Sequence, residues 1–262
     1  MPELPESDMM RRVIERECLN RTIERVEPGD DTKSIDLPGG NARQRLVGRQ
    51  FTRTRRHGKY IMAGSKAGPW MVVHLGMTGK LIAFDAPDEA PDYTKFLIIF
   101  EGDRRLAFRC PRKLGSVEIV DNPESFITEK GLGPDALEIT REQVRDAIGS
   151  SRGAVKAALM SQKKLAGIGN LWSDEILFRI GIHPETPGKA LSEDQLSDAF
   201  DAMIDILDNV LKAEADYTRL PEDWLVRNRN EGTDCSRCGG GTIVTTKVGG
   251  RTAYHCDKHQ QE

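Results

Sequence analysis

Residues 235–259 read CSRCGGGTIVTTKVGGRTAYHCDKH, and this stretch decides the fold of the C-terminal segment. Two short knuckles bracket it, Cys235-Ser-Arg-Cys238 and Cys256-Asp-Lys-His259. Thiolate and imidazole ligands in two such pairs are typical of tetrahedral zinc sites. We therefore expect one structural zinc ion per chain, with no open position for chemistry, held by Cys235, Cys238, Cys256 and His259. His255 is an alternative fourth ligand with poorer spacing.

The segment between the knuckles predicts a β-hairpin. Thr242–Thr246 and Arg251–His255 flank Gly249-Gly250, a pair suited to a tight turn. A hairpin this short has no core of its own, so the metal is expected to stabilise it. The alternative, cysteines placed by chance in a disordered tail, does not explain the spacing.

The preceding region is predicted to be helical. Thr140-Arg-Glu-Gln143 and Ser192-Glu-Asp-Gln195 each have the pattern of a capping box. Between them, Gly153–Ser161 and Leu171–Ile180 carry apolar residues at helical spacing. Beyond about Tyr217 the regular pattern is lost until the cysteine-rich tail.

The first half of the chain predicts strands separated by Gly- and Pro-containing turns, which favours a β-sandwich. A helix should precede it, since Pro5 suits a first helical turn and Met10, Val13, Ile14 and Cys18 recur at core-facing spacing. The expected strands are Thr22–Glu27, Lys59–Ala63, Trp70–Leu75, Lys80–Phe84, Lys95–Phe100, Arg105–Arg109 and Val117–Val120.

Composition limits the possible partners and compartment. The 262 residues carry a net charge of −3, which gives no whole-chain support for a nucleic-acid partner. Between residues 43 and 59, however, seven Arg or Lys side chains occur without an acid. Such a run is either a solvated face or a phosphate-binding surface. We see no membrane-spanning run and no signal peptide, and five cysteines with no disulfide-like spacing favour the reducing cytoplasm.

The N-terminus, Met1-Pro2-Glu3, offers a nucleophile and a proton carrier side by side. Removal of Met1 leaves Pro2 with a free secondary amine, and an α-amino group titrates near pH 7.7–8.0, so a useful fraction is neutral. The alternative is a proline-rich lead into the first helix. The two interpretations are compatible, because a buried helix behind Pro2 would fix the terminus in place.

Together these features resemble the formamidopyrimidine-DNA glycosylase / endonuclease VIII family of DNA glycosylases with abasic-site lyase activity. The resemblance covers essentially the whole chain. It rests, besides the termini, on Arg55-Arg56-His57-Gly58-Lys59-Tyr60, His74-Leu75-Gly76-Met77-Thr78-Gly79 and Leu165-Ala166-Gly167-Ile168-Gly169-Asn170.

The resemblance implies an α+β fold in four parts. These are a catalytic β-sandwich with a leading helix at 1–120, a connector at 121–138, a helix–two-turn–helix DNA-binding domain at 139–230, and a zinc-finger β-hairpin at 231–262. It also implies a monomer that binds damaged double-stranded DNA inside the cell, in the nucleoid, and takes part in base excision repair.

The same resemblance implies the catalytic roles. Pro2 attacks C1′ of the damaged nucleotide and displaces the base, Glu3 carries protons, and elimination then cuts the strand. Lys59 contacts phosphate near the lesion and supports catalysis; the alternative is one more surface lysine in a basic run.

The residues implied to contact DNA come from several motifs. Asn170 and Arg251 are expected to bind phosphates, although Asn170 is also a natural helix cap. Met77 and Leu114 are candidates for filling the space left by an extruded base, or else ordinary core residues. The full set of expected contacts is Arg56, Met77, Arg112, Leu114, Asn170 and Arg251, with Arg112 reading the opposite base.

Three departures from the family pattern bear on the substrate. His259 stands where the family usually has Cys, and Ser7-Asp8 where Val-Glu is common. The stretch from Ala213 to Asn230 is short and lacks the Gly-rich segment that closes over 8-oxoguanine. Oxidised pyrimidines, ring-opened purines and abasic sites therefore all remain candidate substrates.

Two other functions fit parts of the sequence. One is a non-catalytic binder of damaged or abasic DNA with the same fold, which Pro2, Glu3 and Lys59 argue against. The other is a zinc-ribbon nucleic-acid or scaffold protein outside repair, with a chance match at the N-terminus. Borohydride trapping on abasic DNA separates the enzyme from both.

Overall fold

The computed structural model describes residues 1–28 and 42–261. The chain divides into two compact units, Met1–Gly131 and Leu132–Glu262, each with its own core, and the division falls within the stretch expected to be a connector. Among the described residues, no helix is both long and apolar enough to cross a bilayer.

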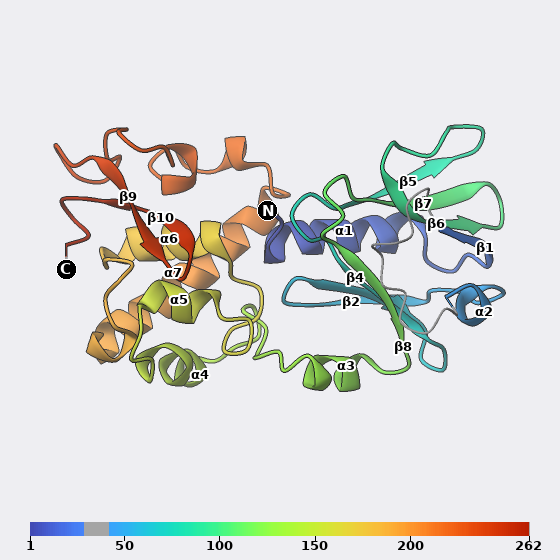
Figure 1. The fold of residues 1–262 in the computed structure, drawn as a ribbon, viewed down its shortest axis with the longest axis horizontal. Helices are drawn as coiled ribbons and strands as arrows, with labels where there is room; N and C mark the ends of the chain where they lie inside the picture. Colours follow the sequence, from blue (N-terminus) through green and yellow to red (C-terminus); the bar gives the residue numbers. More distant parts are fainter. Residues whose placement is uncertain (29–41, 262) are drawn as a thin grey trace. The chain divides into compact units, whose positions relative to one another are not determined.

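The first unit begins with helix α1 (Leu4–Glu17), which packs against strands of both sheets (Figure 1). Pro5 lies in its first turn, and Glu3 and Glu6 form a capping box at its start. Ile14 and Cys18 are fully buried, so the predicted core-facing side of the helix is confirmed.

Two four-stranded antiparallel sheets follow, and one apolar cluster fills the space between them. Ile98 and Phe108 enter this cluster from one sheet, and Ile61 and Val73 from the other. The predicted β-sandwich is therefore confirmed. In spatial order the strands are β1 (Ile23–Pro28), β6 (Thr94–Phe100), β7 (Arg104–Arg109) and β5 (Lys80–Asp85) in one sheet, and β2 (Arg53–His57), β3 (Tyr60–Gly64), β4 (Trp70–His74) and β8 (Ser116–Val120) in the other.

Three elements of this unit had no sequence prediction. β2 reads Arg-Thr-Arg-Arg-His and has no apolar alternation, yet it pairs along its whole length with the buried strand β3. The short helices α2 (Ala42–Leu46) and α3 (Pro123–Glu129) also lay outside the predicted elements. Asn122 caps α3, accepting a hydrogen bond from the Glu124 N–H at 2.7 Å.

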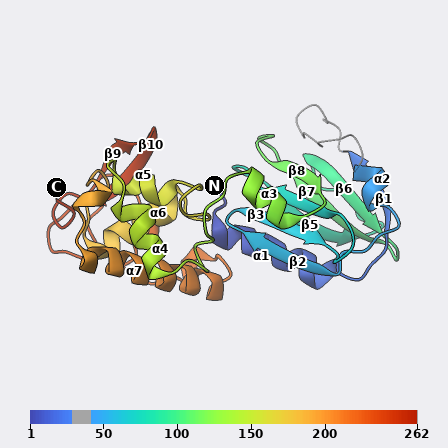
Figure 2. The same cartoon turned by 90° about the horizontal axis from the view of Figure 1, so that it is seen from below.

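The second unit is helical up to about residue 212. Its elements are α4 (Arg141–Val144), the π-helical turn η2 (Arg145–Gly149), α5 (Val155–Met160), α6 (Asn170–Ile180), the short 3-10 turn η3 (Gly188–Ala190) and α7 (Glu193–Lys212). Both predicted capping boxes are present, at Thr140 and Ser192. Figure 2 shows α7 running alongside the shorter helices, and it packs directly on α6.

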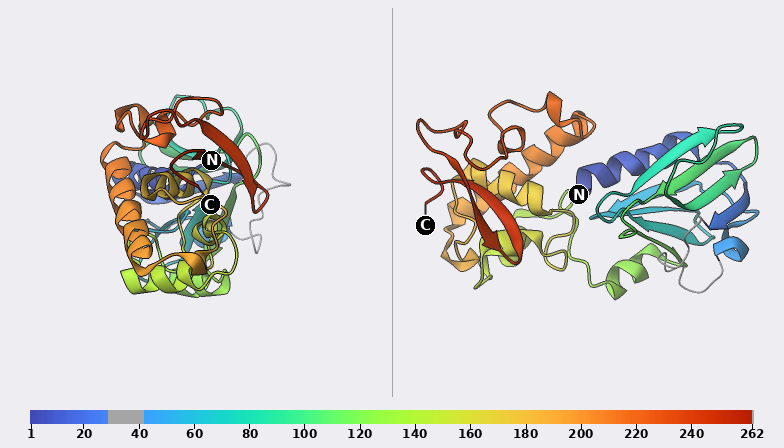
Figure 3. Two further views of the ribbon diagram at one scale, coloured as in Figure 1. Left: turned by 90° about the vertical axis from the view of Figure 1, so that its left-hand side faces the viewer. Right: turned by 45° about the horizontal axis from the view of Figure 1, so that its top comes forward.

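The last part of the unit is the predicted hairpin. Two 3-10 turns, η4 (Tyr217–Arg219) and η5 (Leu225–Arg227), lead to β9 (Ile243–Val248) and β10 (Arg251–Cys256). The strands pair across Gly249-Gly250, both of which have positive φ. β10 lies against α6, as the views in Figure 3 also show.

Candidate functional site

Glu3, the first carboxylate of the chain, lies at the start of α1. Glu3 is 1% exposed, and its N–H donates to Oε2 of Glu6 at 2.7 Å. Pro2 is half-buried directly before it. The first helix thus fixes the position of the Pro2-Glu3 pair, as expected if both the helix-start and the catalytic interpretations hold.

The turn that carries Lys59 is attached to the same helix. Gly58 and Lys59 join β2 to β3, and Gly58 has a φ of 54°, which favours glycine. The Ser7 hydroxyl donates to the Lys59 carbonyl oxygen at 3.3 Å. A segment 52 residues away in sequence is therefore placed beside the N-terminus of α1.

Arg56 supports this turn from within. Its side chain is only 8% exposed, and Nη1 donates to the Gly58 carbonyl oxygen at 3.0 Å. Its Nε lies 3.9 Å from Oδ1 of Asp8. Burial raises the pKa of Asp8, but hydrogen bonds and charge from Arg11 and Arg12 more than offset this and hold the pKa below its ordinary value.

His74 lies at the end of β4, paired with Tyr60 across the strands. The two rings are 5.0 Å apart. Burial, with smaller repulsion from Lys59 and Lys130, lowers the pKa of His74 to about 4. His74 is therefore neutral at physiological pH.

The two candidate wedge residues lie on adjacent turns. A Cβ at Gly76, just before Met77, would lie 2.3 Å from the Leu114 carbonyl oxygen, so only glycine permits this approach. Leu114 is 55% exposed and Met77 is half-buried. Leu114 is thus a surface residue, and the alternative that it belongs to the core is wrong. Arg112, two residues earlier, is also exposed.

Asn170 and Arg251 come together in the second unit. Asn170 is the first residue of α6, and Gly169 occupies the cap position, so the simple capping role is wrong. Instead Nδ2 of Asn170 donates to the Thr252 carbonyl oxygen at 3.1 Å. Arg251, the residue before Thr252, is exposed at the start of β10.

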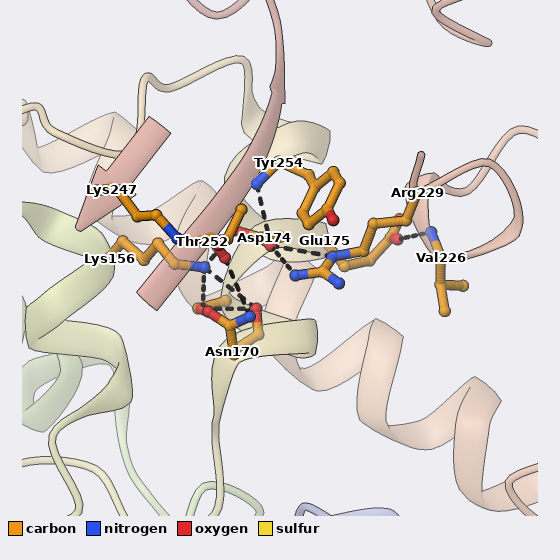
Figure 4. Close-up of polar contacts among 10 residues, drawn as sticks. Lys156, Asn170, Asp174, Glu175, Val226, Arg229, Lys247, Thr252 and Tyr254 are labelled. Atoms are coloured by element: carbon orange, nitrogen blue, oxygen red, sulfur yellow. Dashed lines mark hydrogen bonds and ion pairs between the residues drawn. The ribbon is translucent and has the colours of Figure 1, made fainter. Parts of the chain in front are cut away.

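A buried ion cluster behind Asn170 was not predicted from the sequence. Asp174 accepts hydrogen bonds from Lys156, Arg229 and the Tyr254 N–H (Figure 4). Lys156 is fully buried and Asp174 is 1% exposed. The sequence did contain a signal for this cluster. Lys156 and Asp174 lie inside segments with apolar periodicity, and charges buried there need partners.

The four predicted metal ligands converge. One ligand atom from each of Cys235, Cys238, Cys256 and His259 lies within 4.8 Å of all the others, and the cluster is therefore able to hold a metal ion. His255 is not part of it; its ring instead packs on His183 at 4.5 Å. Of the two candidates for the fourth ligand, the structure favours His259.

The surroundings fit a four-coordinate metal. A Cβ at Gly241 would lie 2.5 Å from Cys256 Sγ, so this glycine leaves room for the sulfurs. Nε2 of His259 is 3.0 Å from the Phe178 carbonyl oxygen, to which it donates when protonated. This leaves Nδ1 facing Cys235 Sγ, at 3.5 Å, as the free ligand atom.

The first unit is a β-sandwich with a capped N-terminal helix, and the second is helical and ends in a hairpin whose Cys3His cluster is able to hold a metal ion. Family models match both units: the formamidopyrimidine-DNA glycosylase N-terminal domain over residues 1–117 and its H2TH domain over residues 131–222. The chain belongs to the formamidopyrimidine-DNA glycosylase family, and its class of enzyme is therefore that of the DNA glycosylases.

Individual relatives match this chain along its whole length. The formamidopyrimidine-DNA glycosylases of Synechococcus sp. and Geobacter metallireducens are 34% and 32% identical, each alignment covering 99% of this chain and 99% and 100% of the relative. A solved structure of the Lactococcus lactis enzyme, non-covalently bound to DNA containing an abasic site, superposes with a TM-score of 0.88 at 26% identity, covering 100% of both chains.

Proposed function

We propose that this chain excises damaged bases from DNA and then cuts the strand at the resulting abasic site, with the Pro2 nitrogen as nucleophile. The observation that carries the proposal is the attachment of the Pro2-Glu3 pair and the Lys59 turn to one end of α1. This arrangement holds a nucleophile, a proton carrier and a cation within one unit.

The proposed reaction uses Pro2 and Glu3 of this chain together with one water molecule. The Pro2 amine attacks C1′, and the bond to the base breaks as the base leaves with the proton that the attacking amine loses. Opening of the sugar ring gives an iminium ion, which draws electrons from C2′. Loss of a C2′ proton and of the 3′ phosphate cuts the strand, and water then hydrolyses the iminium to release Pro2.

Glu3 and Lys59 take separate roles in this proposal. Glu3 donates a proton to the opening sugar and accepts the proton lost from C2′. Lys59 binds a phosphate beside the lesion. Arg56 acts indirectly, because its guanidinium is buried on the Gly58 carbonyl and supports the turn.

The proposed metal is one zinc ion, bound by Cys235, Cys238, Cys256 and His259. The Cys3His ligand set and the space at Gly241 support zinc over harder cations, which prefer oxygen ligands. Zinc supplies no chemistry here; it holds the hairpin that presents Arg251.

We propose that DNA is bound by phosphate contacts from Asn170 and Arg251, while Met77 and Leu114 fill the gap left by the extruded nucleotide. Solved structures of the Lactococcus lactis relative contain DNA with an abasic site and, for one variant, DNA with Fapy-dG. Both are substrates to test with this chain, which we propose acts as a monomer.

The conformation of residues 213–230, which lie in the described part of the chain, supports a proposal on lesion preference. This segment is fixed by its own contacts. Arg227 donates to the Tyr217 carbonyl oxygen at 3.0 Å, and Trp224 is buried. No long loop is left there to close over 8-oxoguanine. We therefore propose that abasic sites, ring-opened purines and oxidised pyrimidines are processed faster than 8-oxoguanine.

Borohydride reduction on abasic DNA tests this proposal against its main alternative, a non-catalytic binder. A covalent protein–DNA adduct is expected from the wild type. Glu3→Gln should bind lesion DNA with unchanged affinity but excise the base at least about a hundredfold more slowly, because only proton transfer is lost. Tight binding without any adduct would leave the non-catalytic binder as the function.

A further inference from the structure

The outer edge of β10 is bound by two side chains of one helix. Asn170 donates to the Thr252 carbonyl oxygen at 3.1 Å, and Oδ2 of Asp174 accepts the Tyr254 N–H at 3.2 Å (Figure 4). Within the described part of the chain, β10 pairs with β9 alone. Every second residue of an antiparallel strand points its backbone groups away from its partner, and α6 satisfies two of these.

The spacing of the two contacts matches helix to strand. Asn170 and Asp174 are four residues apart, so they lie one above the other on the same face of α6, about 6 Å apart along its axis. Thr252 and Tyr254 are two residues apart on a strand, which is about 6.6 Å. The pair therefore fixes both the distance of β10 from α6 and its position along the helix.

Asp174 is also the centre of the ion cluster. Its second acceptor, Oδ1, pairs with Lys156, whose Nζ in turn donates to the Asn170 carbonyl oxygen at 3.2 Å. On the other side, Nη2 of Arg229 donates to Oδ2 at 2.6 Å, and its guanidinium lies 4.2 Å over the Tyr254 ring. One buried carboxylate therefore pairs with two cations. Lys156 connects it to the start of α6, and Arg229 connects it to β10.

We propose that Asp174 is a positioning residue for DNA binding: it sets the register of β10 on α6, so that Arg251 and the start of α6 engage neighbouring phosphates together. This rests on the proposed function. Arg251 lies one residue before Thr252, so a shift of β10 by one residue would move it by about 3.3 Å. Such a shift is enough to lose a hydrogen bond to phosphate.

The first test needs no DNA. In zinc-loaded protein, Asp174→Asn should reduce the hydrogen-exchange protection of the Tyr254 amide at least about tenfold, because one amide oxygen then serves three donors. Asp205→Asn is the matched control, since it removes an equal charge from an exposed pair with Arg179 on the same unit. Its Tyr254 protection should equal that of the wild type. Unchanged Tyr254 protection in Asp174→Asn overturns the inference.

The second test measures coupling to Arg251 with duplex DNA containing a tetrahydrofuran abasic analogue. Asp174→Asn and Arg251→Ala should each weaken binding by about tenfold. The double variant should be no more than about twofold weaker than Arg251→Ala, because Asp174 then has no arginine left to position. If the double variant instead binds about a hundredfold more weakly than the wild type, the two single effects multiply. Asp174 would then act independently of Arg251, which contradicts the proposal.

A charge-balanced variant guards against misfolding. Lys156→Met/Asp174→Asn removes one buried cation together with the anion, and Arg229 is 19% exposed and so reaches water. This variant should keep its zinc and show the same loss of Tyr254 protection and the same coupling to Arg251. Loss of zinc would mean that Asp174 stabilises the fold of the hairpin and does not set its register. Failure of the wild type to bind abasic DNA would refute the proposed function, whereas the exchange test would still decide the role of Asp174.

Discussion

The Ser7 hydroxyl and the Lys59 carbonyl oxygen are 3.3 Å apart, and this hydrogen bond attaches the Lys59 turn to the first helix. Ser7 is 1% exposed. Ser7 stands at one of the positions where the sequence departs from the family pattern. The residue found there makes the hydrogen bond to the Lys59 turn.

The first prediction concerns this contact. Ser7→Ala should slow base excision by about three- to tenfold, since it displaces the Lys59 cation beside the reacting sugar. DNA affinity should change less than twofold, because the other phosphate contacts remain. Single-turnover rates and a binding curve on the same lesion duplex measure the two effects. Ser192→Ala, which removes the hydroxyl that caps α7, is the control and should lower stability but leave the rate unaltered. Equal rates for Ser7→Ala and the wild type would refute the positioning role.

The second prediction concerns pH. Burial raises the pKa of Glu175 to about 7, against 4.5 for the exposed group. Between these values the folded state binds more protons than the unfolded state, so this group lowers stability as pH rises from 4.5 to 7. Each unit of pKa difference corresponds to about 1.4 kcal/mol.

Glu175→Gln removes this titration and keeps an acceptor for the Val226 N–H, now 2.9 Å from Oε2. The variant should therefore gain thermal stability relative to the wild type at pH 8 but not at pH 4.5. Melting temperatures across this range give the comparison. A difference between the two proteins that does not depend on pH would show that Glu175 keeps an ordinary pKa.

The third prediction concerns the fourth metal ligand. His259→Ala should lose zinc, measured by elemental analysis after dialysis, because Nδ1 of this residue faces Cys235 Sγ. His255→Ala should retain one zinc per chain, since its ring packs on His183 outside the cluster. Removal of zinc should abolish DNA binding and leave the core of the β-sandwich folded. The reverse pattern of zinc loss would assign the ligand to His255.

The fourth prediction separates phosphate binding from base reading. Each phosphate ion pair contributes a slope of about −0.9 in log K against log salt, so Arg251→Ala should flatten the salt dependence by about one unit for every lesion alike. Arg112→Ala should instead change the preference for the base opposite the lesion. A change of opposite-base preference in Arg251→Ala, with an unaltered salt slope, would place these residues on the wrong surfaces.

The sequence predicted those parts of the fold that have a local pattern. The capping boxes at Thr140 and Ser192, the apolar spacing of the first helix, and the glycine pair of the hairpin all identify their elements directly. β2 could not be found in this way. It is a strand because the neighbouring strand β3 is apolar and supplies its hydrogen bonds, and this information lies outside its own five residues.

The same distinction applies to the site. Spacing was enough to predict the four residues that converge into a cluster able to hold a metal ion, because the knuckles are local. In the cluster of Lys156, Asp174 and Arg229, the partners of Asp174 are 18 and 55 residues away in sequence, and only the fold brings them together. The buried state of Arg56 is likewise a tertiary result, since the sequence alone placed it in an exposed-looking basic run.

In the proposed reaction the Pro2 nitrogen becomes covalently bound to the sugar. In the chain as translated this nitrogen is an amide, so Met1 must first be removed. The most direct measurement is mass spectrometry of the N-terminal peptide after borohydride reduction on abasic DNA and digestion. We predict a peptide that begins at Pro2, lacks Met1 and carries the reduced sugar on its first residue. A peptide that retains Met1 in fully active enzyme, or a sugar attached to a lysine such as Lys59, would contradict it.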